Sequence, residues 1–341
     1  MNFSTVSKQR DRAEKLFIFI CFICVIVSAV LGVCLGSVSI SAGEFFAAMF
    51  SGSSSVNARI ILFARVPRVA ASILAGSALA VSGVIIQSVL ENPLAAPSII
   101  GVNSGAGFAA VLAMAIFPNT PSAVPAAAFI GAVLTVMVVY LIAVKNGASK
   151  ITLVLAGVAV SNLLSAGIDT ITTFFPDSLN GITDFKIGGV MGTSLAKLHP
   201  AWIYICAGII LAMLLSHELD ILALGDRTAK SLGMNVKAVR FALLFSAALL
   251  AGAAVSFAGL LSFIGLIIPH IARHFIKSGN RRLIPASALL GAAFVTFCDM
   301  LSRVLFAPYE IQLGIVVSYI GVPFFIYLIM KKKGGRHGDR A

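Results

Sequence analysis

The feature that most constrains this chain is a succession of long apolar segments separated by short polar ones. Most of the segments have about 20 residues, the length that an α-helix needs to cross the hydrocarbon core of a bilayer. A helix also satisfies its own backbone hydrogen bonds in lipid, so we predict an all-α, polytopic integral membrane protein with about ten transmembrane helices in one domain, residues 1–341. The predicted spans are residues 16–36, 66–90, 94–116, 122–144, 151–175, 199–216, 238–260, 262–276, 283–306 and 311–330.

Two of these spans are atypical. Span 16–36 follows a basic start, as in a signal peptide, but it is too long for the apolar core of one and no clear cleavage site follows. We expect it to remain as a helix. Span 262–276 is short for a full crossing and contains Pro269 and His270, so we expect a broken or partly re-entrant helix there.

The composition excludes a soluble domain, because 59% of the 341 residues are hydrophobic and only 11% are charged. The net charge of +12 would suit a nucleic acid partner. However, the charged residues lie between the apolar runs and do not form a basic stripe with aromatic residues. They are placed as determinants of membrane topology, so we expect no nucleic acid partner.

The basic residues also predict the orientation of the chain. With both termini in the cytoplasm, the inner segments hold 19 of the 25 Lys and Arg residues, as the positive-inside rule requires. Residues 1–15 and the basic tail 331–341 are then cytoplasmic ends, and residues 217–240 form the longest cytoplasmic insert. Three arginines at outer span ends are exceptions that need a reason: Arg65, Arg68 and Arg303.

A weak internal repeat occurs at an offset of 176 residues. Ala75, Gly76, Ala78, Gly83 and Pro93 match Ala251, Gly252, Ala254, Gly259 and Pro269. In the predicted topology the first copy starts outside and the second inside, so the two would form an inverted repeat, a common plan in transporters. The alternative is a chance match, since these spans are rich in the small residues that let helices pack closely.

The sequence lacks the signatures of an ATPase or an enzyme. No lysine follows a glycine, so there is no GxxxxGK[ST] phosphate-binding loop. Cys21 and Cys24 have redox spacing without a second pair, and His270 and His274 lack the glutamate of a metalloprotease helix. We therefore expect no catalytic residues, no metal site and no cofactor bound by this chain.

Two carboxylates inside the spans leave a second function open. Asp169 and Asp299 are the clearest ionisable residues within apolar segments, and ion-coupled carriers commonly use such groups. An ion-coupled secondary transporter that uses Asp169 or Asp299 is therefore the alternative to the function considered next. The other explanation is that the two aspartates cap helices, form ion pairs or reach the interface.

Several motifs follow one another along nearly the whole chain. They are Arg65-Val66-Pro67-Arg68, Glu91-Asn92-Pro93-Leu94-Ala95, Gly101-Val102, Leu155-Ala156-Gly157-Val158, Leu224-Gly225-Asp226, Phe263-Ile264-Gly265 with Pro269-His270, and Gly321-Val322-Pro323. In order and spacing they resemble the membrane permease subunits of ABC importers for ferric siderophores, haem and cobalamin, the FecCD/BtuC-like family. One departure is Gln312, which stands where the family often has a proline.

This resemblance implies an import function and a set of partners. The chain would be one of two permease subunits around a central path, paired with a second copy or with a paralogue. Two cytoplasmic ATP-binding subunits would hold ATP and Mg²⁺, and an external solute-binding protein would deliver the iron chelate. The location would be a bacterial plasma membrane. The resemblance does not select one chelate.

The resemblance and the topology also predict two sites at the ends of the path. Outside, Arg65, Arg68 and Arg303 would meet acidic residues of the solute-binding protein, because a guanidinium can hold a carboxylate by two parallel hydrogen bonds. The alternative is that these arginines reach lipid phosphates. Inside, Asn92 and Leu94 would belong to a cytoplasmic gate, or Asn92 would simply cap a helix in a turn.

A third site is predicted in the insert 217–240. Its apolar pattern indicates two short helices hinged at Gly225. Because such helices can move as rigid levers, we expect the insert to couple the spans to the ATPase; a solvated loop is the alternative. The coupling residues would be Leu224, Gly225, Asp226, Leu232 and Gly233.

Overall fold

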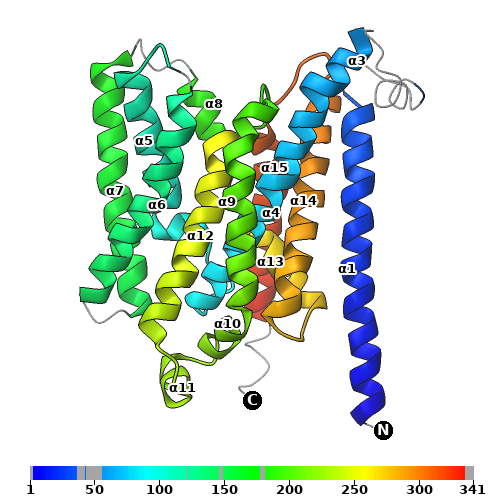
Figure 1. The fold of residues 1–341 in the computed structure, drawn as a ribbon, viewed down its shortest axis with the longest axis vertical. Helices are drawn as coiled ribbons and strands as arrows, with labels where there is room; N and C mark the ends of the chain where they lie inside the picture. Colours follow the sequence, from blue (N-terminus) through cyan, green and yellow to red (C-terminus); the bar gives the residue numbers. More distant parts are fainter. Residues whose placement is uncertain are drawn as a thin grey trace.

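Helices form all the regular secondary structure in the parts of the chain that the computed structural model describes, residues 3–36, 43, 56–120, 122–145, 149–176 and 181–334. The long helices stand side by side in one bundle (Figure 1). They are α1 (Phe3–Cys34), α4 (Val66–Val89), α5 (Val102–Ile116), α6 (Ala123–Lys145), α7 (Lys150–Phe174), α9 (Leu195–Leu214), α12 (Val236–Ala258), α13 (Ile264–Phe275), α14 (Asn280–Val304) and α15 (Leu313–Gly334). Short helices connect them: α3 (Val56–Ile60), a π-helical turn (Ile61–Arg65), a 3-10 turn (Pro97–Ile100), α8 (Ile182–Ile187), α10 (Ser216–Leu222) and α11 (Asp226–Ser231).

Seven helices in the described residues are long and apolar enough to cross a membrane. The prediction of an all-helical membrane protein is therefore confirmed, whereas the count of about ten spans is not. Two further apolar helices, Val102–Ile116 and Leu313–Leu328, are shorter than the seven. The tail 331–341 lies outside the described residues beyond Gly334.

Two predicted spans were wrong in detail. Span 94–116 becomes helical only at Val102, because Pro97 begins a 3-10 turn and Gly101 takes a left-handed conformation with φ of 86°. For span 262–276 the expected break is wrong, since α13 continues through Pro269, whereas a partly re-entrant helix stays a prediction. Proline at the sixth position of a twelve-residue helix removes one backbone hydrogen bond and leaves the rest of the helix in place.

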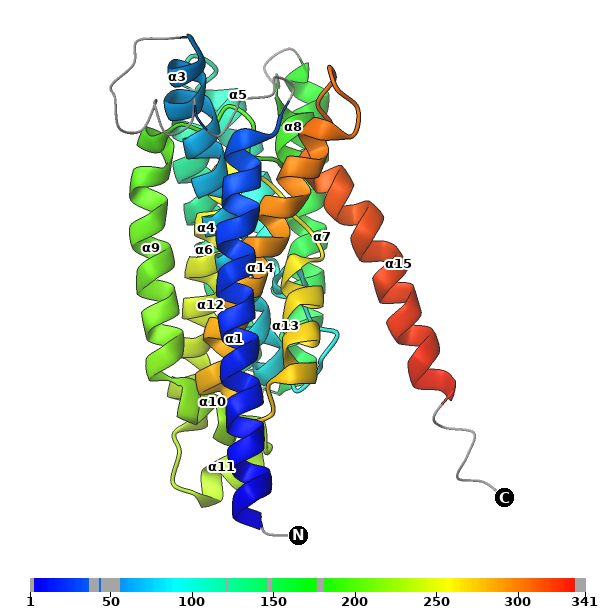
Figure 2. The same ribbon diagram turned by 90° about the vertical axis from the view of Figure 1, so that its right-hand side faces the viewer.

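Helix α4 lies at the centre of the bundle. In its most apolar window 78% of the residues are buried, compared with 17% in α7 and 22% in α1. It packs against α14, α12 and α13, and Figure 2 shows it behind α1 and α14. The helices that surround α4 hold it in place, whereas α7 presents most of its apolar surface outward.

Two pairs of glycines allow α4 to approach its neighbours closely. A Cβ on Gly76 would overlap the carbonyl oxygen of Gly291 in α14, and a Cβ on Gly83 would overlap the carbonyl oxygen of Gly265 in α13. Small residues at helix crossings let backbones meet and so replace the missing hydrophobic driving force in lipid. The dense Ala and Gly pattern of the sequence therefore serves packing at these crossings.

The structure does not confirm the internal repeat. Helices α4 and α12 run in opposite directions (Figure 1), as an inverted repeat requires. However, Gly83 lies inside α4, whereas its counterpart Gly259 ends α12 with φ of 66°. Pro93 lies in a turn, whereas its counterpart Pro269 lies inside α13. Two of the five matched pairs thus occupy different secondary structure, whereas the other three lie inside α4 and α12.

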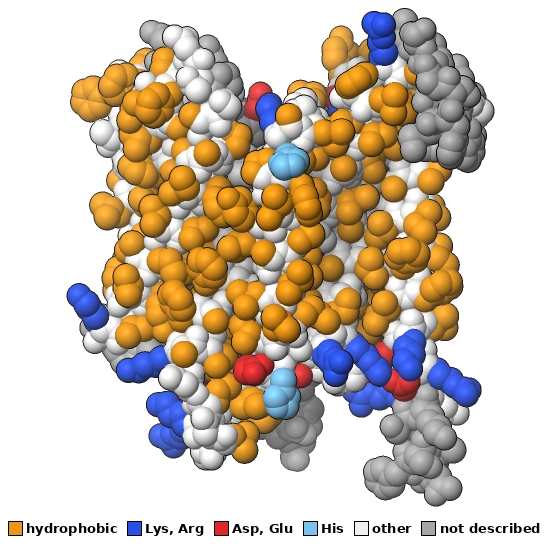
Figure 3. All heavy atoms as spheres, viewed as in Figure 1, with side chains coloured by type: hydrophobic (Ala, Val, Ile, Leu, Met, Phe, Trp, Pro, Cys, Tyr) orange, Lys and Arg blue, Asp and Glu red, His pale blue; other side chains and the backbone are white. Residues whose placement is uncertain are grey.

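The two ends of the bundle differ in charge. The start of α1 and the end of α15 lie at the same end, which we call the termini face (Figures 1 and 2). In Figure 3 a broad hydrophobic band covers the middle of the molecule, and most Lys and Arg side chains gather at the termini face. This distribution is typical of a membrane protein whose termini face lies in the cytoplasm.

Candidate functional site

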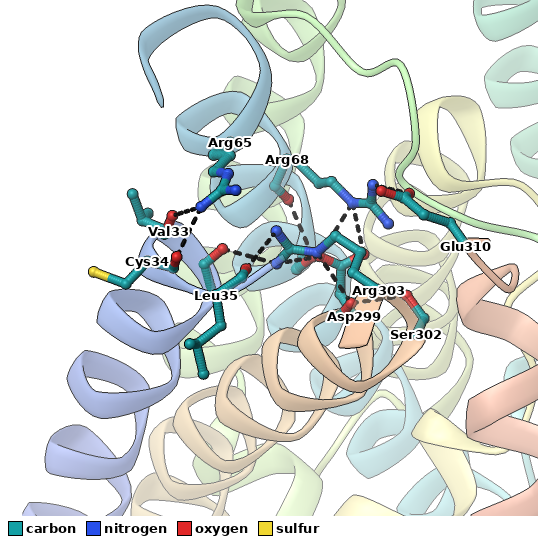
Figure 4. Close-up of polar contacts among 11 residues, drawn as sticks. Val33, Cys34, Leu35, Arg65, Arg68, Asp299, Ser302, Arg303 and Glu310 are labelled. Atoms are coloured by element: carbon teal, nitrogen blue, oxygen red, sulfur yellow. Dashed lines mark hydrogen bonds and ion pairs between the residues drawn. The ribbon is translucent and has the colours of Figure 1, made fainter. Parts of the chain in front are cut away.

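At the end of the bundle opposite the termini face, two arginines bind the carboxyl end of α1 (Figure 4). Arg65 Nη1 donates to the carbonyl oxygens of Val33 at 2.7 Å and Cys34 at 2.9 Å. Arg303 donates to the carbonyls of Gly32 at 2.8 Å and Leu35 at 3.2 Å. The last carbonyls of a helix have no partner within it and carry partial negative charge, so arginine satisfies both needs.

A buried carboxylate joins the same cluster (Figure 4). Asp299 is fully buried and accepts from Arg68 Nε at 2.9 Å, and its second oxygen lies 3.2 Å from Arg303 Nη2. The Nη1 of Arg68 also donates to Glu310 at 2.7 Å. Since Glu310 precedes α15, the cluster ties α1, α4 and α14 to the segment that leads into α15.

The exposure of the outer arginines indicates which of them a partner can reach. Arg65 is 6% exposed and Arg303 is 3% exposed, so neither stands free at a helix end to reach a partner or a lipid phosphate. Arg68 is the most accessible of the three, and its Glu310 partner is one-quarter exposed. Docking of a binding protein at these residues stays a prediction, and Arg68 with Glu310 is the part of the cluster that a partner can reach.

The two aspartates of the alternative function differ in their surroundings. Asp299 is held between two guanidinium groups, as the pairing explanation predicted. Asp169 is exposed on α7, and among the described residues it takes part in no ion pair. Asp299 is thus fixed in place by two guanidinium groups, which is the arrangement of a structural ion pair.

At the termini face, the turn after α4 contains the predicted gate residues. Asn92 Oδ1 accepts from the backbone nitrogen of Leu94 at 3.0 Å, so its side chain holds the backbone two residues ahead. Asn92 is exposed and Leu94 is half-buried. Gln87, buried in the last turns of α4, donates to the carbonyls of Gly265 and Leu266 at 3.3 and 3.2 Å. The turn is therefore anchored to the start of α13.

The insert forms the two short helices that its pattern predicted. Helices α10 and α11 are separated at Gly225, whose φ of 100° suits glycine, and α11 protrudes at the termini face beyond α9, α10 and α12 (Figure 1). Leu224 and Leu232 are 65% and 62% exposed. Two exposed leucines on a protruding helical element suit a protein interface. Gly233, with φ of 80°, follows α11.

Sequence reasoning missed the polar contacts that hold this insert. Asp220 of α10 accepts from both the backbone nitrogen and the side-chain amide of Asn280, at 2.9 and 2.6 Å. Asp226 of α11 lies 2.6 Å from Nη2 of the buried Arg240 and 3.9 Å from Lys150 Nζ. The sequence pattern indicates Lys150 and Arg240 only as determinants of topology and Asp226 only as a coupling residue. Their partners come from distant segments, so spacing along the chain gave no signal for them.

The apolar bundle, with a charged cluster at one end and a protruding insert at the other, has the architecture of an integral membrane transport protein. Residues 23–331 match the sequence model of the FecCD transport family. The chain belongs to the FecCD transport family. It is thus a transport permease of the ABC importer class, and the resemblance recognised in its motifs is confirmed.

Relatives with different cargoes are similar to this chain over most of its length. The Fe(3+)-citrate import system permease protein YfmE of Bacillus subtilis is 36% identical over 94% of this chain and 98% of its own. The iron(3+)-hydroxamate import system permease protein FhuB of the same organism is 38% identical over 93% and 83%. The vitamin B12 import system permease protein BtuC of Vibrio cholerae is 35% identical over 85% and 88%.

A solved structure supports the fold independently. A transporter described as a metal-chelate type ABC transporter, in an inward-facing conformation, matches with a TM-score of 0.82 and 27% identity. The match covers 93% of this chain and 99% of that chain. The helical arrangement in Figures 1 and 2 is therefore one that ABC permeases use.

Proposed function

We propose that this chain is the transmembrane permease subunit of an ATP-binding-cassette importer that translocates an iron chelate. The observation that carries the proposal is similarity at 35–38% identity to permeases named for ferric citrate, ferric hydroxamate and vitamin B12. Because these cargoes differ while the identities are nearly equal, the similarity supports the class of cargo. A ferric siderophore is the first candidate, with haem and cobalamin as the others.

The proposed topology has ten spans, with both termini in the cytoplasm of a bacterial cell. The seven long helices together with α5, α13 and α15 supply the ten. The positive charge of the termini face supports this orientation. A second permease, either a copy or a paralogue, would pack against apolar surface that the bundle leaves uncovered. Such surface is large on α7 and α15, where Leu163 is 73% exposed and Tyr319 79%.

Each end of the bundle then has a partner. The insert, through Leu224 and Leu232, would bind one of two cytoplasmic ATPases, which hold ATP and Mg²⁺. The turn with Asn92 and Leu94 would form the cytoplasmic gate. At the outer end, an external solute-binding protein would dock at Arg68, with Arg65 and Arg303 holding the helix ends beneath it. In this scheme the chain itself catalyses no reaction.

Transport by reconstituted vesicles tests the proposal. The permease and its ATPase are placed in liposomes with ATP inside, and the binding protein loaded with a radiolabelled ferric siderophore is added outside. We expect uptake only when ATP and the binding protein are both present. Uptake driven by a proton or sodium gradient alone, and lost in Asp169→Asn, would favour the ion-coupled alternative.

A further inference from the structure

A chain of charged side chains at the termini face connects the insert with the turn after α4. Lys150, the first residue of α7, forms an ion pair with Glu91 and lies 3.9 Å from Asp226 Oδ1. The same oxygen of Asp226 lies 2.6 Å from Arg240 Nη2 in α12. Glu91 immediately precedes the predicted gate residue Asn92, and Asp226 opens α11. Lys150 thus stands between the two predicted sites.

The two ends of this chain are held differently. Arg240 is 1% exposed within α12, so Asp226 has a second cation partner on a long buried helix, at the base of α11. Lys150 and Glu91 are about one-quarter and one-third exposed, and Glu91 has a left-handed backbone with φ of 48°. That conformation is strained for a residue other than glycine. The turn therefore depends on contacts such as the ion pair of Glu91 for its shape.

The hinge of the insert lies at the same place. A Cβ built on Gly225, between α10 and α11, would lie 3.9 Å from Glu91 Oε1. A rotation of α11 about Gly225 would therefore change the distance from Lys150 to Asp226 and leave Glu91 as the second carboxylate within its reach. An ammonium group that lies between two carboxylates pairs more strongly with the nearer one, because the attraction between charges falls with distance.

We propose that Lys150 is the positioning residue that transmits movement of the insert to the gate turn. This inference rests on the proposed function, in which the insert binds the ATPase and the turn forms the gate. When the ATPase moves α11, Asp226 approaches or leaves Lys150, and the hold of Lys150 on Glu91 weakens or strengthens. The turn with Asn92 and Leu94 is thereby released or locked.

The test is the number of cargo molecules transported per ATP hydrolysed in reconstituted vesicles. Lys150→Met keeps the length of the side chain and removes its charge. We expect this ratio to fall roughly fivefold or more, the lower bound of typical coupling between distant sites, while ATP hydrolysis continues. Lys150→Arg should keep the ratio near that of the natural chain. Glu91→Gln, which preserves shape, should lower it as Lys150→Met does.

The matched control is Lys145→Met. Lys145 ends α6 at the same face, is exposed, and among the described residues forms no ion pair. It should leave the ratio unchanged. A ratio unchanged in both Lys150→Met and Glu91→Gln, with only the unfolding temperature lowered, would show an ordinary salt bridge and overturn the inference. If the natural chain transports without ATP, the proposed function fails instead, so the two failures are distinguishable.

Discussion

At the scale of residues, the outer cluster shows how a membrane protein uses arginine in its interior. Asp299 is fully buried, and burial of a lone carboxylate is costly. Arg68 and Arg303 supply two cations, and the carbonyls of α1 satisfy the remaining donors of Arg303. The three charges therefore depend on one another, and removing one leaves the others unpaired.

We expect Asp299→Asn to lower the free energy of unfolding by about 3–5 kcal/mol, the usual cost of breaking a buried ion pair by removing one partner. Chemical denaturation in detergent micelles measures this. Asp169→Asn, at an exposed position on α7, is the control and should change it by less than about 0.5 kcal/mol. Equal effects of the two substitutions would mean that the pairs in the cluster add no stability.

Arg68 and Arg303 both pair with Asp299, so replacing either should lower the unfolding temperature, whereas only Arg68 should also contribute to docking. Arg68→Gln should weaken binding of the solute-binding protein by up to about fivefold, since a partly exposed ion pair contributes only about 0–1 kcal/mol, and the loss should shrink at high salt. Arg303→Gln should mainly lower the unfolding temperature, because its bonds are internal. Fluorescence titration measures binding. Unchanged affinity in Arg68→Gln would place the docking surface elsewhere.

At the scale of helices, apolar length predicts most elements but not their ends or contacts. Residues 94–101 are mostly apolar, which predicts part of a span, although Pro97 and Gly101 favour the turn that forms there. The leucines of the insert could be predicted, because α10 and α11 are short helices formed by residues that are close in the sequence. The ion pair of Arg68 with Asp299 could not be predicted, because the two residues are 231 positions apart and neither segment's sequence indicates which residue it will contact.

At the crossing of α4 and α13, replacing a glycine with alanine has two opposing effects on stability. Gly83→Ala would raise intrinsic helix propensity and so stabilise α4 by up to about 1 kcal/mol. However, the new Cβ would overlap the carbonyl oxygen of Gly265, and overpacking typically costs about 1–3 kcal/mol. We expect net destabilisation, measured by thermal unfolding in detergent.

Gly189→Ala is the control for that experiment, because its nearest Cβ contact would be an ordinary 3.8 Å. It should leave the unfolding temperature nearly unchanged. If Gly83→Ala proves more stable than the natural chain, the close approach of α4 and α13 is not a constraint on this fold.

The insert as an element should bind through its exposed leucines. Leu232→Asp should weaken binding of the ATPase roughly tenfold or more, a loss of about 1.4 kcal/mol, without lowering the unfolding temperature, since Leu232 is 62% exposed. Leu305→Asp, at a 59% exposed leucine at the opposite end, is the matched control. Pull-down of the ATPase measures the difference, and equal binding by both variants would exclude Leu232 from the interface.

At the scale of the whole molecule, transport requires that events at the two ends of the bundle be linked. Helix α4 spans this distance: it starts next to Arg65, within the outer cluster, and ends at the turn that contains Asn92 and Leu94. Its most apolar window is 78% buried, and glycine pairs fix it to α13 and α14. A helix held this firmly is suited to act as a rigid support, so the parts that move should be the turn after it and the insert.

If the turn after α4 forms the gate, the two permeases of the complex should bring their Asn92 residues together when the path is closed. Asn92 is exposed, so Asn92→Cys should fold normally and present a reactive thiol. Cys24 and Cys206 are also exposed and Cys34 is partly so, and these three must first be replaced by serine to prevent unrelated crosslinks. Under oxidising conditions we expect a disulfide-linked dimer in the closed nucleotide state and much less of it in the open state, measured on a non-reducing gel.

The control is Ser231→Cys, at an exposed position on α11. It tests for random collision and should give no nucleotide-dependent crosslink. Because a disulfide forms only when the two Cα atoms come within about 7 Å, absence of the crosslink in every nucleotide state would place the gate elsewhere along the path.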